Sequence, residues 1–283
     1  MDWIRDLPTW PNASASKRIS CAPHRWHVQI IGQGPDVLLL HGSGSSAHSW
    51  AGLIDQLHTE MRCIAVDMPG HGFTQSRKPI RNGRKDISQD LERLILQEGW
   101  SPKLIIGHSA GAVVALDLAA RMDTPVGVVG LNAALAQFDG VAGWLFPIMA
   151  RTLASIPFTA RLFSAGPNPQ ARARRLILGT GSVPPPKMMR CYSRLISDRD
   201  HVAGALNMMA QWSLDDVVAN LSRFQDPVLF ITAENDRAVP AGVSHSAAGR
   251  MPNAKVVDLT GLGHLAHEED PGTVARIIKK WVL

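Results

Sequence analysis

The 283-residue sequence predicts an α/β protein with a mostly parallel sheet, helices on both faces of that sheet and a helical lid inserted near the middle. Three observations predict this fold. Short apolar runs alternate with helical patterns along most of the chain, and one run leads into Gly107-His108-Ser109-Ala110-Gly111. The alternation stops between about residues 133 and 213. We therefore expect a core made of residues 1–132 and 214–283 and a lid made of residues 133–213.

The expected strands are short apolar runs that end at glycine, proline or a polar turn. Trp26–Ile30 alternates in polarity, which is typical of an antiparallel edge strand. The later runs favour buried parallel strands and are Val37–Leu40, Cys63–Val66, Leu104–Ile106, Val126–Leu131, Val228–Ile231 and Lys255–Leu259. The first 20 or so residues are expected to be loosely held.

Helical patterns lie between these runs, near residues 50–57, 87–98, 112–121 and 272–281. Within residues 133–213 we find no convincing strand, but several apolar helical patterns that prolines interrupt. An insertion of this kind after a sheet strand is expected to lie over the strand ends as a lid.

Composition excludes several classes of protein. A hydrophobic content of 45% and a charged content of 19% exclude a disordered chain. The formal net charge is +5, and the positive charge gathers between residues 140 and 213, where only Asp198 and Asp200 oppose it. That segment lacks the interleaved aromatic residues of proteins that bind single-stranded nucleic acid, so no nucleic-acid partner is expected.

Cysteines and apolar runs indicate the compartment. Cys21, Cys63 and Cys191 match neither a disulfide framework nor a metal-ligand spacing, which favours a reducing cytosol. The first residues contain acids and no apolar core of signal-peptide length. No apolar run approaches the roughly 20 residues that span a bilayer. We predict a cytoplasmic protein, with the apolar stretch 141–150 as the candidate for peripheral contact with a membrane surface.

The segment from Gly107 to Gly111 is the strongest chemical signal, because strand, Gly-x-Ser-x-Gly and helix together form a nucleophile elbow. In such a turn the serine adopts a strained backbone conformation, and small neighbours let the strand and helix come close. Ser109 is then at the positive end of a helix, where an oxyanion can be stabilised. We predict that Ser109 is a nucleophile; the competing interpretation is a small residue in a tight turn.

A serine nucleophile needs a base, and the base needs an acid that orients it. In doubly wound hydrolases the acid and then the histidine follow the nucleophile along the chain. Asp236 comes directly after the run 228–231, and His264 directly after the run 255–259. Like Ser109, both follow the carboxyl ends of parallel strands, where α/β proteins place their sites. The sequence therefore predicts Ser109, Asp236 and His264 as the catalytic set.

Rival residues lie close to two members of this set. His267 competes with His264, which could also be a structural histidine in a glycine-rich loop. Glu234 competes with Asp236, which could instead pair with Arg237 or cap the following helix.

An oxyanion hole needs two backbone N–H groups that converge on one point. We expect one from Ala110, the residue after the nucleophile. We expect the other from Ser43, in the loop His41-Gly42-Ser43-Gly44-Ser45 that follows the run 37–40. The glycines of this loop allow its backbone to fold under a substrate carbonyl.

Other polar residues near these positions are expected to have structural roles. His108 is next to Ser109, but neighbours at an elbow point apart, so its role is positional. Asp67 is expected to form a turn, and His41 and His71 to be structural. No cluster of His, Cys, Asp or Glu has convincing metal spacing, and no glycine-rich phosphate loop is present, so neither a metal nor a cofactor is expected.

Together the elbow, the segments His41–Gly44 and Asp67–Gly72, and the two residues Asp236 and His264 resemble the α/β-hydrolase superfamily over nearly the whole chain. The resemblance implies the α/β-hydrolase fold and a serine hydrolase. A haloalkane dehalogenase would need a carboxylate in place of Ser109, so that branch is excluded.

Further segments resemble the magnesium-chelatase accessory proteins of bacteriochlorophyll synthesis. They are Trp26–Gln29, Leu131–Leu135, Gly179–Ser182, His201–Leu206, Asn235–Pro240 and Gly261–Glu269. Several lie in the lid, where general hydrolases share little, so the match is specific. It implies a role in inserting Mg²⁺ into protoporphyrin IX, with the ATP-driven chelatase subunits as partners.

The lid is also the candidate substrate-binding region, through Trp144, Met149, Met208 and Trp212. If the ligand is the implied porphyrin, these residues would form a flat apolar pocket. Lid arginines would then meet the porphyrin propionates: Arg172, Arg174, Arg175, Arg190 and Arg194. The competing interpretation is that the apolar residues pack the lid helices and the arginines are solvated.

Three functional hypotheses follow from the sequence. The first is an accessory protein of magnesium chelatase whose Ser–His–Asp site is competent for ester or acyl hydrolysis. The second is a non-catalytic porphyrin carrier or chelatase partner on the same fold. The third is an unrelated carboxylesterase or carbon–carbon bond hydrolase.

Overall fold

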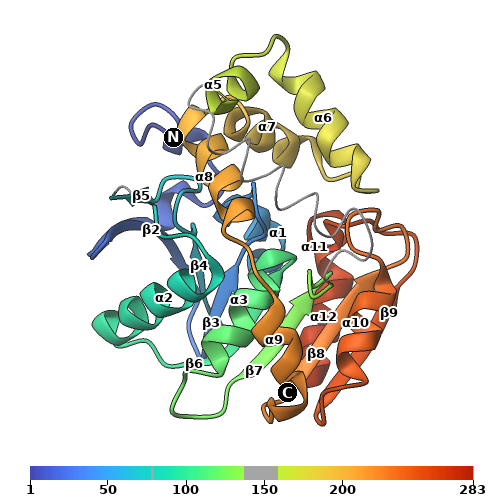
Figure 1. Ribbon diagram of the computed structural model, residues 1–283. Coiled ribbons are helices and arrows are strands. Elements are labelled where there is room, and N and C mark those ends of the chain that lie inside the picture. Colours follow the sequence, from blue (N-terminus) through green and yellow to red (C-terminus); the bar gives the residue numbers. More distant parts are fainter. Residues whose placement is uncertain (78–79, 137–158, 283) are drawn as a thin grey trace.

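One sheet organises the computed structural model, which describes residues 1–77, 80–136 and 159–282. The order of its strands is β1-β2-β4-β3-β6-β7-β8-β9, with β5 paired to β2 (Figure 1). The strands are β1 (Ser16–Cys21), β2 (His24–Ile31), β3 (Asp36–Leu40), β4 (Arg62–Val66), β5 (Gln75–Ser76), β6 (Pro102–His108), β7 (Gly127–Leu131), β8 (Val228–Ala233) and β9 (Ala254–Leu259).

The strands from β4 to β9 are parallel to their neighbours in that part of the sheet. Every residue of β3 and of β8 is buried. Alternate residues serve opposite faces, since Leu38 and Leu40 belong to one apolar cluster and Val37 and Leu39 to the other. Burial on both faces explains why these strands are continuous apolar runs in the sequence. All of the predicted strands are confirmed.

The prediction that residues 26–30 form an edge strand is wrong. β2 is antiparallel as expected, but it lies between β1 and β4, because Ser16–Cys21 pairs with it along the whole length of β1. Only Ile19 and Cys21 of β1 are buried, so its sequence lacks the apolar run that indicates the other strands.

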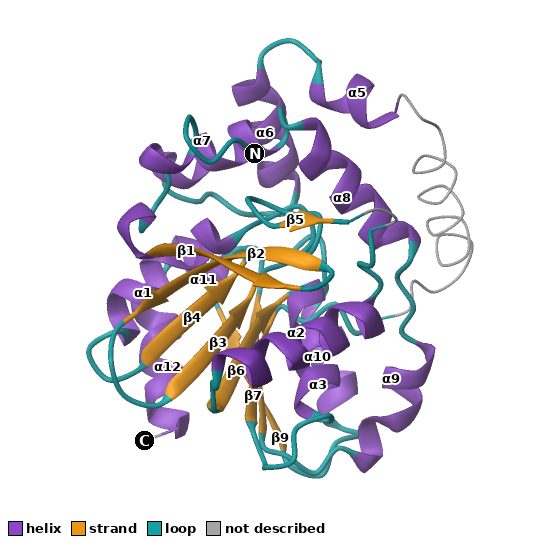
Figure 2. Cartoon of the chain, turned by 90° about the vertical axis from the view of Figure 1, so that its left-hand side faces the viewer, coloured by secondary structure: helices purple, strands orange, loops and turns teal. Residues whose placement is uncertain are grey.

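Helices cover both faces of the sheet (Figure 2). On one face lie α1 (Ala51–Leu57), preceded by the 3-10 turn η3 (Ala47–Trp50), α11 (Ala266–Glu269) and α12 (Pro271–Val282). On the other face lie α2 (Arg84–Glu98), α3 (Ala110–Ala119) and α10 (Ala241–Ala248). The four predicted helices are confirmed, with α2 beginning three residues before the expected start at residue 87.

A helical insertion follows β7, as predicted. Its described helices are α5 (Thr159–Ser164), α6 (Pro169–Gly179), α7 (Pro186–Leu195) and α8 (Arg199–Ala210), here called the lid helices. They lie above the sheet in Figure 1, and α9 (Asp215–Asn220) and the 3-10 turn η4 (Leu221–Arg223) lead back to β8. The described residues between β7 and β8 contain no strand. The domain boundaries at 132 and 214 stay a prediction.

Glycines let the lid approach the core closely. A Cβ atom on Gly204 of α8 would lie 1.9 Å from the carbonyl oxygen of Gly70, in the loop after β4. A Cβ on Gly181, before α7, would lie 1.9 Å from the carbonyl oxygen of Asn235. Real Cβ atoms do not come so near, so both contacts require glycine. The lid backbone therefore rests directly on loops at the carboxyl ends of the strands.

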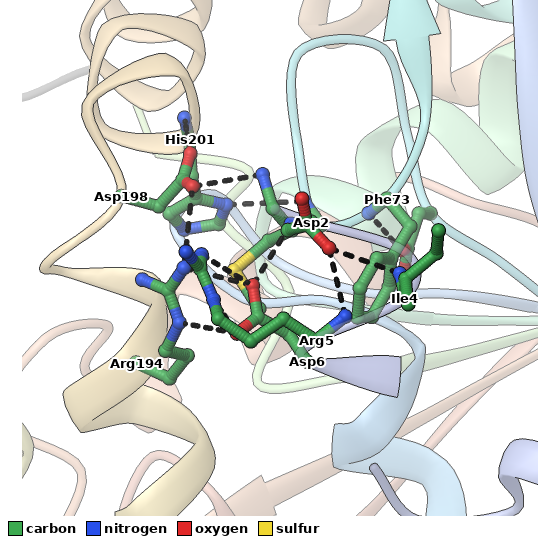
Figure 3. Close-up of polar contacts among 11 residues, drawn as sticks. Asp2, Ile4, Arg5, Asp6, Phe73, Arg194, Asp198 and His201 are labelled. Carbon is green, nitrogen blue, oxygen red and sulfur yellow. Dashed lines mark hydrogen bonds and ion pairs between the residues drawn. The ribbon is translucent and has the colours of Figure 1, made fainter. Parts of the chain in front are cut away.

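The first 20 residues pack against the lid and the sheet, so the expectation that they are loosely held is wrong. Leu7 and Trp10, in and just after the 3-10 turn η1 (Leu7–Thr9), pack in a cluster with Met188 and Tyr192 of α7. The carboxylate of Asp6 accepts hydrogen bonds from Arg194 at 2.9 and 2.8 Å (Figure 3). A second 3-10 turn, η2 (Ala13–Ala15), leads into β1. Residues 1–15, here called the N-terminal segment, thus bind the lid helices to the sheet.

Two further expectations concern membranes and thiols. None of the helices in the described part of the chain combines the length and the apolar character that a membrane span needs. The stretch 141–150, expected as a membrane contact, lies outside the described residues. Cys21, Cys63 and Cys191 are buried and unpaired with one another.

The contact between Gly204 and Gly70 predicts a stability effect. Gly204→Ala is expected to lower the free energy of unfolding by about 1–3 kcal/mol, because the added methyl group forces two backbones apart. The measurement is urea unfolding followed by tryptophan fluorescence. Gly242→Ala in α10 is the matched control, since nothing lies within 4 Å of a Cβ there; it should leave stability unchanged or raise it by up to about 1 kcal/mol. Equal effects of the two substitutions would contradict the close approach of the lid.

Candidate active site

Ser109 lies at the turn between β6 and α3 with φ of 52° and ψ of −117°, an unfavourable backbone conformation for a residue other than glycine. The turn depends on two glycines. A Cβ on Gly107 would lie 2.3 Å from the carbonyl oxygen of Gly111, and a Cβ on Gly111 would lie 2.1 Å from that of Leu40. Strand β6, helix α3 and strand β3 therefore meet without side chains between them, and the serine is held at the amino end of α3.

His264 and Asp236 are hydrogen-bonded to each other. The Nδ1 atom of His264 lies 2.7 Å from Oδ2 of Asp236, and both residues are buried. The other carboxylate oxygen of Asp236 accepts backbone N–H groups from Ala238 and Val239 at 2.7 and 2.8 Å. Because Nδ1 of His264 faces the carboxylate, Nε2 is the nitrogen left for a reacting group.

The loop that carries His264 is held against the elbow. His108, next to Ser109, donates its Nε2–H to the carbonyl oxygen of His264 at 2.9 Å. Asn132, which follows β7, donates to the same oxygen at 2.8 Å. Burial lowers the pKa of His108 well below its usual value, so its ring is a neutral donor. His108 thus holds the loop of His264 in place, which is the positional role expected for it.

Ser109 and His264 are brought into one site, but no hydrogen bond joins their side chains in the described part of the chain. In unliganded sites this contact is often long and shortens only when substrate binds.

The predicted oxyanion loop packs directly on the elbow. A Cβ on Gly42 would lie 3.1 Å from Cβ of Ser109. The loop is a tight turn, closed by a hydrogen bond from the N–H of Ser45 to the carbonyl oxygen of Gly42 at 3.2 Å. Within the described residues, neither the N–H of Ser43 nor that of Ala110 has a hydrogen-bond partner. Both are therefore available to an oxyanion.

Two histidines fix the shape of this loop, and their tautomers follow from their contacts. His41 accepts the N–H of Met68 at Nε2, so its Nδ1–H donates to the carbonyl oxygen of Gly42 at 2.7 Å. His201 of α8 accepts the N–H of Gly72 at Nδ1, so its Nε2–H donates to the carbonyl oxygen of Gly44 at 3.1 Å. Burial lowers the pKa of both rings, which keeps them neutral.

Asp67 anchors the turns beneath the oxyanion loop, in agreement with its expected role in a turn. The fully buried carboxylate accepts the N–H of Ala47 at 2.6 Å and that of Phe73 at 2.7 Å. Its third partner is the Nδ1 atom of His27 at 2.6 Å. Burial disfavours the charged form of Asp67, but His27 and the backbone donors outweigh it and hold its pKa well below the usual value.

The rivals of the predicted base and acid lie elsewhere. Glu234 is exposed and accepts the N–H of Gly261, so it does not face His264. His267 is fully buried, and its Nε2 atom bonds the hydroxyl of Ser49 at 2.9 Å. Burial lowers the pKa of His267 to about 3. Geometry therefore favours Asp236 and His264, whose catalytic roles stay a prediction.

The segment before α7 supports the loops of Asp236 and His264, a role that neither its spacing nor its residue types predict. The N–H of Arg237, next to Asp236, donates to the carbonyl oxygen of Thr180 at 3.0 Å. The hydroxyl of Ser182 accepts the N–H of Leu265, next to His264, at 2.7 Å. The signal in the sequence is the run of small residues Gly179–Ser182, which also belongs to the resemblance with the magnesium-chelatase accessory proteins.

The structure describes two of the four predicted substrate-binding residues. Trp144 and Met149 lie outside the described residues. Met208 has no exposed area and packs in the apolar cluster of α2 and α3, and Trp212 is half-buried against the same cluster. Contact of the four predicted residues with a substrate stays a prediction.

The lid arginines also differ in their surroundings. Arg194 is paired with Asp6, and Arg172 donates to the carbonyl oxygen of Gly166 at 2.9 Å. Arg174, Arg175 and Arg190 are exposed. Among the described residues, no three His, Cys, Asp or Glu side chains gather where they could hold a metal ion.

Comparisons with known proteins show the family of this chain. A family model described as "alpha/beta hydrolase fold" matches residues 35–271. The chain is 43% identical over 282 residues to the magnesium-chelatase 30 kDa subunit of Rhodobacter capsulatus, with 98% of each chain covered. It is 26% identical over 262 residues to a pimeloyl-(acyl-carrier protein) methyl ester esterase of Xanthomonas axonopodis pv. citri, with 90% of this chain and 98% of the relative covered.

A solved structure is similar in fold. The chain superposes on a variant of the epoxide hydrolase of Solanum tuberosum with a TM-score of 0.78 and 18% identity, covering 94% of this chain and 98% of that one. At this identity the likeness shows the fold alone.

The contacts of Asp67 predict a pH-dependent loss of stability. Asp67→Asn should lower the free energy of unfolding at pH 7 by about 3 kcal/mol, because it removes a buried charge from its partners. The folded-state pKa of Asp67 lies below its unfolded value, so its stabilisation is complete above that unfolded value, about 3.9, and is lost as the pH falls through the folded-state pKa. Urea unfolding of both proteins at pH 7 and at pH 3–4 should show the difference shrinking in acid. A difference independent of pH would contradict the ionised state assigned to Asp67.

Proposed function

This chain belongs to the alpha/beta hydrolase fold family, in the group that includes the magnesium-chelatase 30 kDa subunit, and on that premise we propose that it is an accessory protein of magnesium chelatase. It would act in bacteriochlorophyll biosynthesis, at the insertion of Mg²⁺ into protoporphyrin IX. The identity of 43% over almost the full length of both chains supports this assignment. Both resemblances predicted from the sequence, to the superfamily and to the closer group, are confirmed.

We further propose that Ser109, His264 and Asp236 form a serine hydrolase site. The observation that carries this proposal is the strained turn of Ser109 against a loop whose histidine is hydrogen-bonded to a buried carboxylate at 2.7 Å. A carrier protein has no need of an unfavourable backbone conformation at a serine, or of unpartnered N–H groups beside it.

The proposed chemistry is acyl transfer to Ser109. His264 Nε2 takes the proton of the Ser109 hydroxyl as its oxygen attacks the carbonyl carbon of an ester or similar acyl group. The resulting oxyanion accepts hydrogen bonds from the N–H groups of Ser43 and Ala110, each worth about 3–4 kcal/mol in comparable sites. His264 then protonates the leaving group, and water hydrolyses the acyl-enzyme by the same steps. Asp236 keeps the proton of His264 on Nδ1 and stabilises the imidazolium.

The non-catalytic alternative rests on a different observation. Arg174, Arg175 and Arg190 present positive charge on the lid surface, which suits the carboxylates of a porphyrin, an acidic chelatase subunit or an anionic membrane. In that alternative the protein carries or presents the porphyrin, and Ser109 is not required. A third candidate, an esterase with a substrate of its own, is suggested by the relatives that are methyl ester esterases.

The test of the catalytic proposal uses Ser109→Ala. A fluorophosphonate probe is expected to label the wild-type chain covalently and not this variant, because labelling needs an activated serine. In a strain that lacks this protein, the wild type should restore magnesium insertion, and Ser109→Ala should leave the metal-free porphyrin to accumulate. Full complementation by Ser109→Ala would favour the carrier, and unchanged pigment in the deletion strain would favour the separate esterase.

The choice of acid is tested by a matched pair of substitutions. Asp236→Asn should lower kcat/KM for p-nitrophenyl acetate by about 10⁴-fold, because an amide favours the wrong tautomer of His264. Glu234→Gln removes a neighbouring charge and should change kcat/KM by less than about 2-fold, since Glu234 faces solvent. Comparable losses in both variants would refute the assignment of Asp236.

A further inference from the structure

A buried carboxyl group lies between the lid and the core, outside the proposed catalytic set. Glu268, in α11, is 4% exposed. Its Oε1 atom accepts a hydrogen bond from the hydroxyl of Tyr192 in α7 at 2.6 Å, and a second one from the hydroxyl of Ser49 in η3. Its Oε2 atom is buried and has no hydrogen-bond partner among the described residues.

The directions of these hydrogen bonds extend from Glu268 to the oxyanion loop. Tyr192 gives its hydroxyl proton to Glu268, so its oxygen accepts the hydroxyl of Ser45 at 3.3 Å. Ser49 likewise gives its proton to Glu268, so its oxygen accepts the Nε2–H of His267. Glu268 is therefore the common acceptor of two chains of hydrogen bonds. One ends in the oxyanion loop, and the other ends three residues after His264.

Ser45 is a critical residue of that loop. Its N–H closes the turn on the carbonyl oxygen of Gly42, and the turn contains Ser43, one of the two proposed oxyanion donors. The same turn is bonded to the lid a second time, through His201 and the carbonyl oxygen of Gly44. Two lid helices, α7 and α8, thus each supply one side chain that holds the turn.

We propose that Glu268 and Tyr192 are positioning residues of the hydrolase site: the carboxylate of Glu268 orients Tyr192, Tyr192 holds Ser45 and the oxyanion turn, and uptake of a proton by Glu268 weakens this hold. The inference rests on the proposed function and adds to it a second ionisation that controls reactivity. Neither residue touches the reacting atoms. Because Oε1 already accepts two hydroxyl groups, the proton would go to Oε2, and the neutral acid is a weaker acceptor for Tyr192.

Burial and a neighbouring charge bring the pKa of the Glu268 carboxyl group close to neutral pH. Burial raises the pKa of Glu268 to about 7, with the charge of Glu269 acting in the same direction and the hydrogen bonds from Ser49 and Tyr192 opposing it. Glu268 therefore changes charge at a pH where the protein can be assayed.

The other titratable groups that face Glu268 either do not change charge near pH 7 or are present in both the wild type and the Glu268 variant. Burial lowers the pKa of His48 in η3 and of His267 in α11 to about 3. In α7, burial raises the pKa of the Cys191 thiol to about 12 and that of Tyr192 well above its usual value. Glu269 and His264 lie in the same segment and are unchanged in a Glu268 variant, so their contributions cancel in a ratio of rates. The same holds for Lys187 and Arg190 of α7.

The first experiment observes Tyr192 directly. Tyr192 is the only tyrosine of the chain, so [4-¹³C]tyrosine labelling of the full-length protein gives one NMR signal. We expect its chemical shift to follow pH with a midpoint of about 7 in the wild type and in Ser109→Ala, and to lose this transition in Glu268→Gln. No transition in the wild type, or the same transition in Glu268→Gln, would overturn the inference without bearing on Ser109.

The second experiment measures the rate constant for labelling of Ser109 by a fluorophosphonate between pH 5.5 and 8.5. Glu268→Gln mimics the protonated acid, so its rate should match the wild type at pH 5.5 and fall to about one tenth of it at pH 8.5, with a midpoint near 7. A tenfold change corresponds to about 1.4 kcal/mol, within the range for one hydrogen bond to a charged group. Tyr192→Phe should behave in the same way, and the double variant should be no slower than either single variant.

Controls and outcomes separate this inference from the proposed function. Glu60→Gln removes an exposed carboxylate before β4, at the opposite edge of the sheet, and should match the wild type at every pH. Labelling of the wild type with a rate ratio that does not depend on pH would overturn the positioning role and leave the hydrolase site intact. Absence of labelling in the wild type at all pH values would overturn the proposed function, and the positioning role with it. Tyr192→Phe keeps the test decisive if Glu268→Gln fails to fold, because it removes the same link with Glu268 in place.

Discussion

Close contact between backbones is the constraint on which the site depends. At the elbow, Gly107 and Gly111 let β6, β3 and α3 meet without side chains, which is what holds Ser109 in its strained conformation. The same device recurs between lid and core, where Gly204 meets Gly70 and Gly181 meets Asn235. Apolar packing tolerates small shifts, whereas backbones in contact have few alternatives. Loops at the carboxyl edge of the sheet, which would otherwise be mobile, are therefore held between two rigid layers.

Hydrogen bonds from buried histidines and acids then set the details of those loops. His41, His108 and His201 each donate to a carbonyl oxygen of a loop in the site, and each is kept neutral by burial. A buried neutral ring with one donor and one acceptor fixes direction as well as distance. Asp67 fixes its neighbouring turns in the same way, but through a charged group. A buried carboxylate needs hydrogen-bond donors to be stable in the interior, and Asp67 has three. His201 belongs to α8, so the lid is a structural part of the site.

Much of this arrangement could be predicted from the sequence, and the reasons differ by element. Parallel strands buried on both faces are apolar runs, and the order of nucleophile, acid and histidine along the chain indicated which loops would meet. β1 was missed because Ser16–Cys21 is mostly polar and lacks the apolar run that indicates the other strands. The contacts of Tyr192 join residues 147 and 76 positions apart in the sequence, and no local pattern encodes such a distance. Its partner Glu268 stands in the run Glu268-Glu269-Asp270, which is typical of an exposed helix start, although its side chain is buried.

The N-terminal segment favours the position of the lid that is described above. Leu7, Trp10 and Asp6 occupy a site on α7 as a bound peptide would, but β1 tethers that peptide to the sheet. A tether of this kind gives an effective concentration on the order of millimolar, whatever the concentration of the protein. The chain thus carries a ligand for its own lid, and this ligand cannot diffuse away. Any partner that opens the lid from this side must outcompete an occupant that rebinds as soon as it is released.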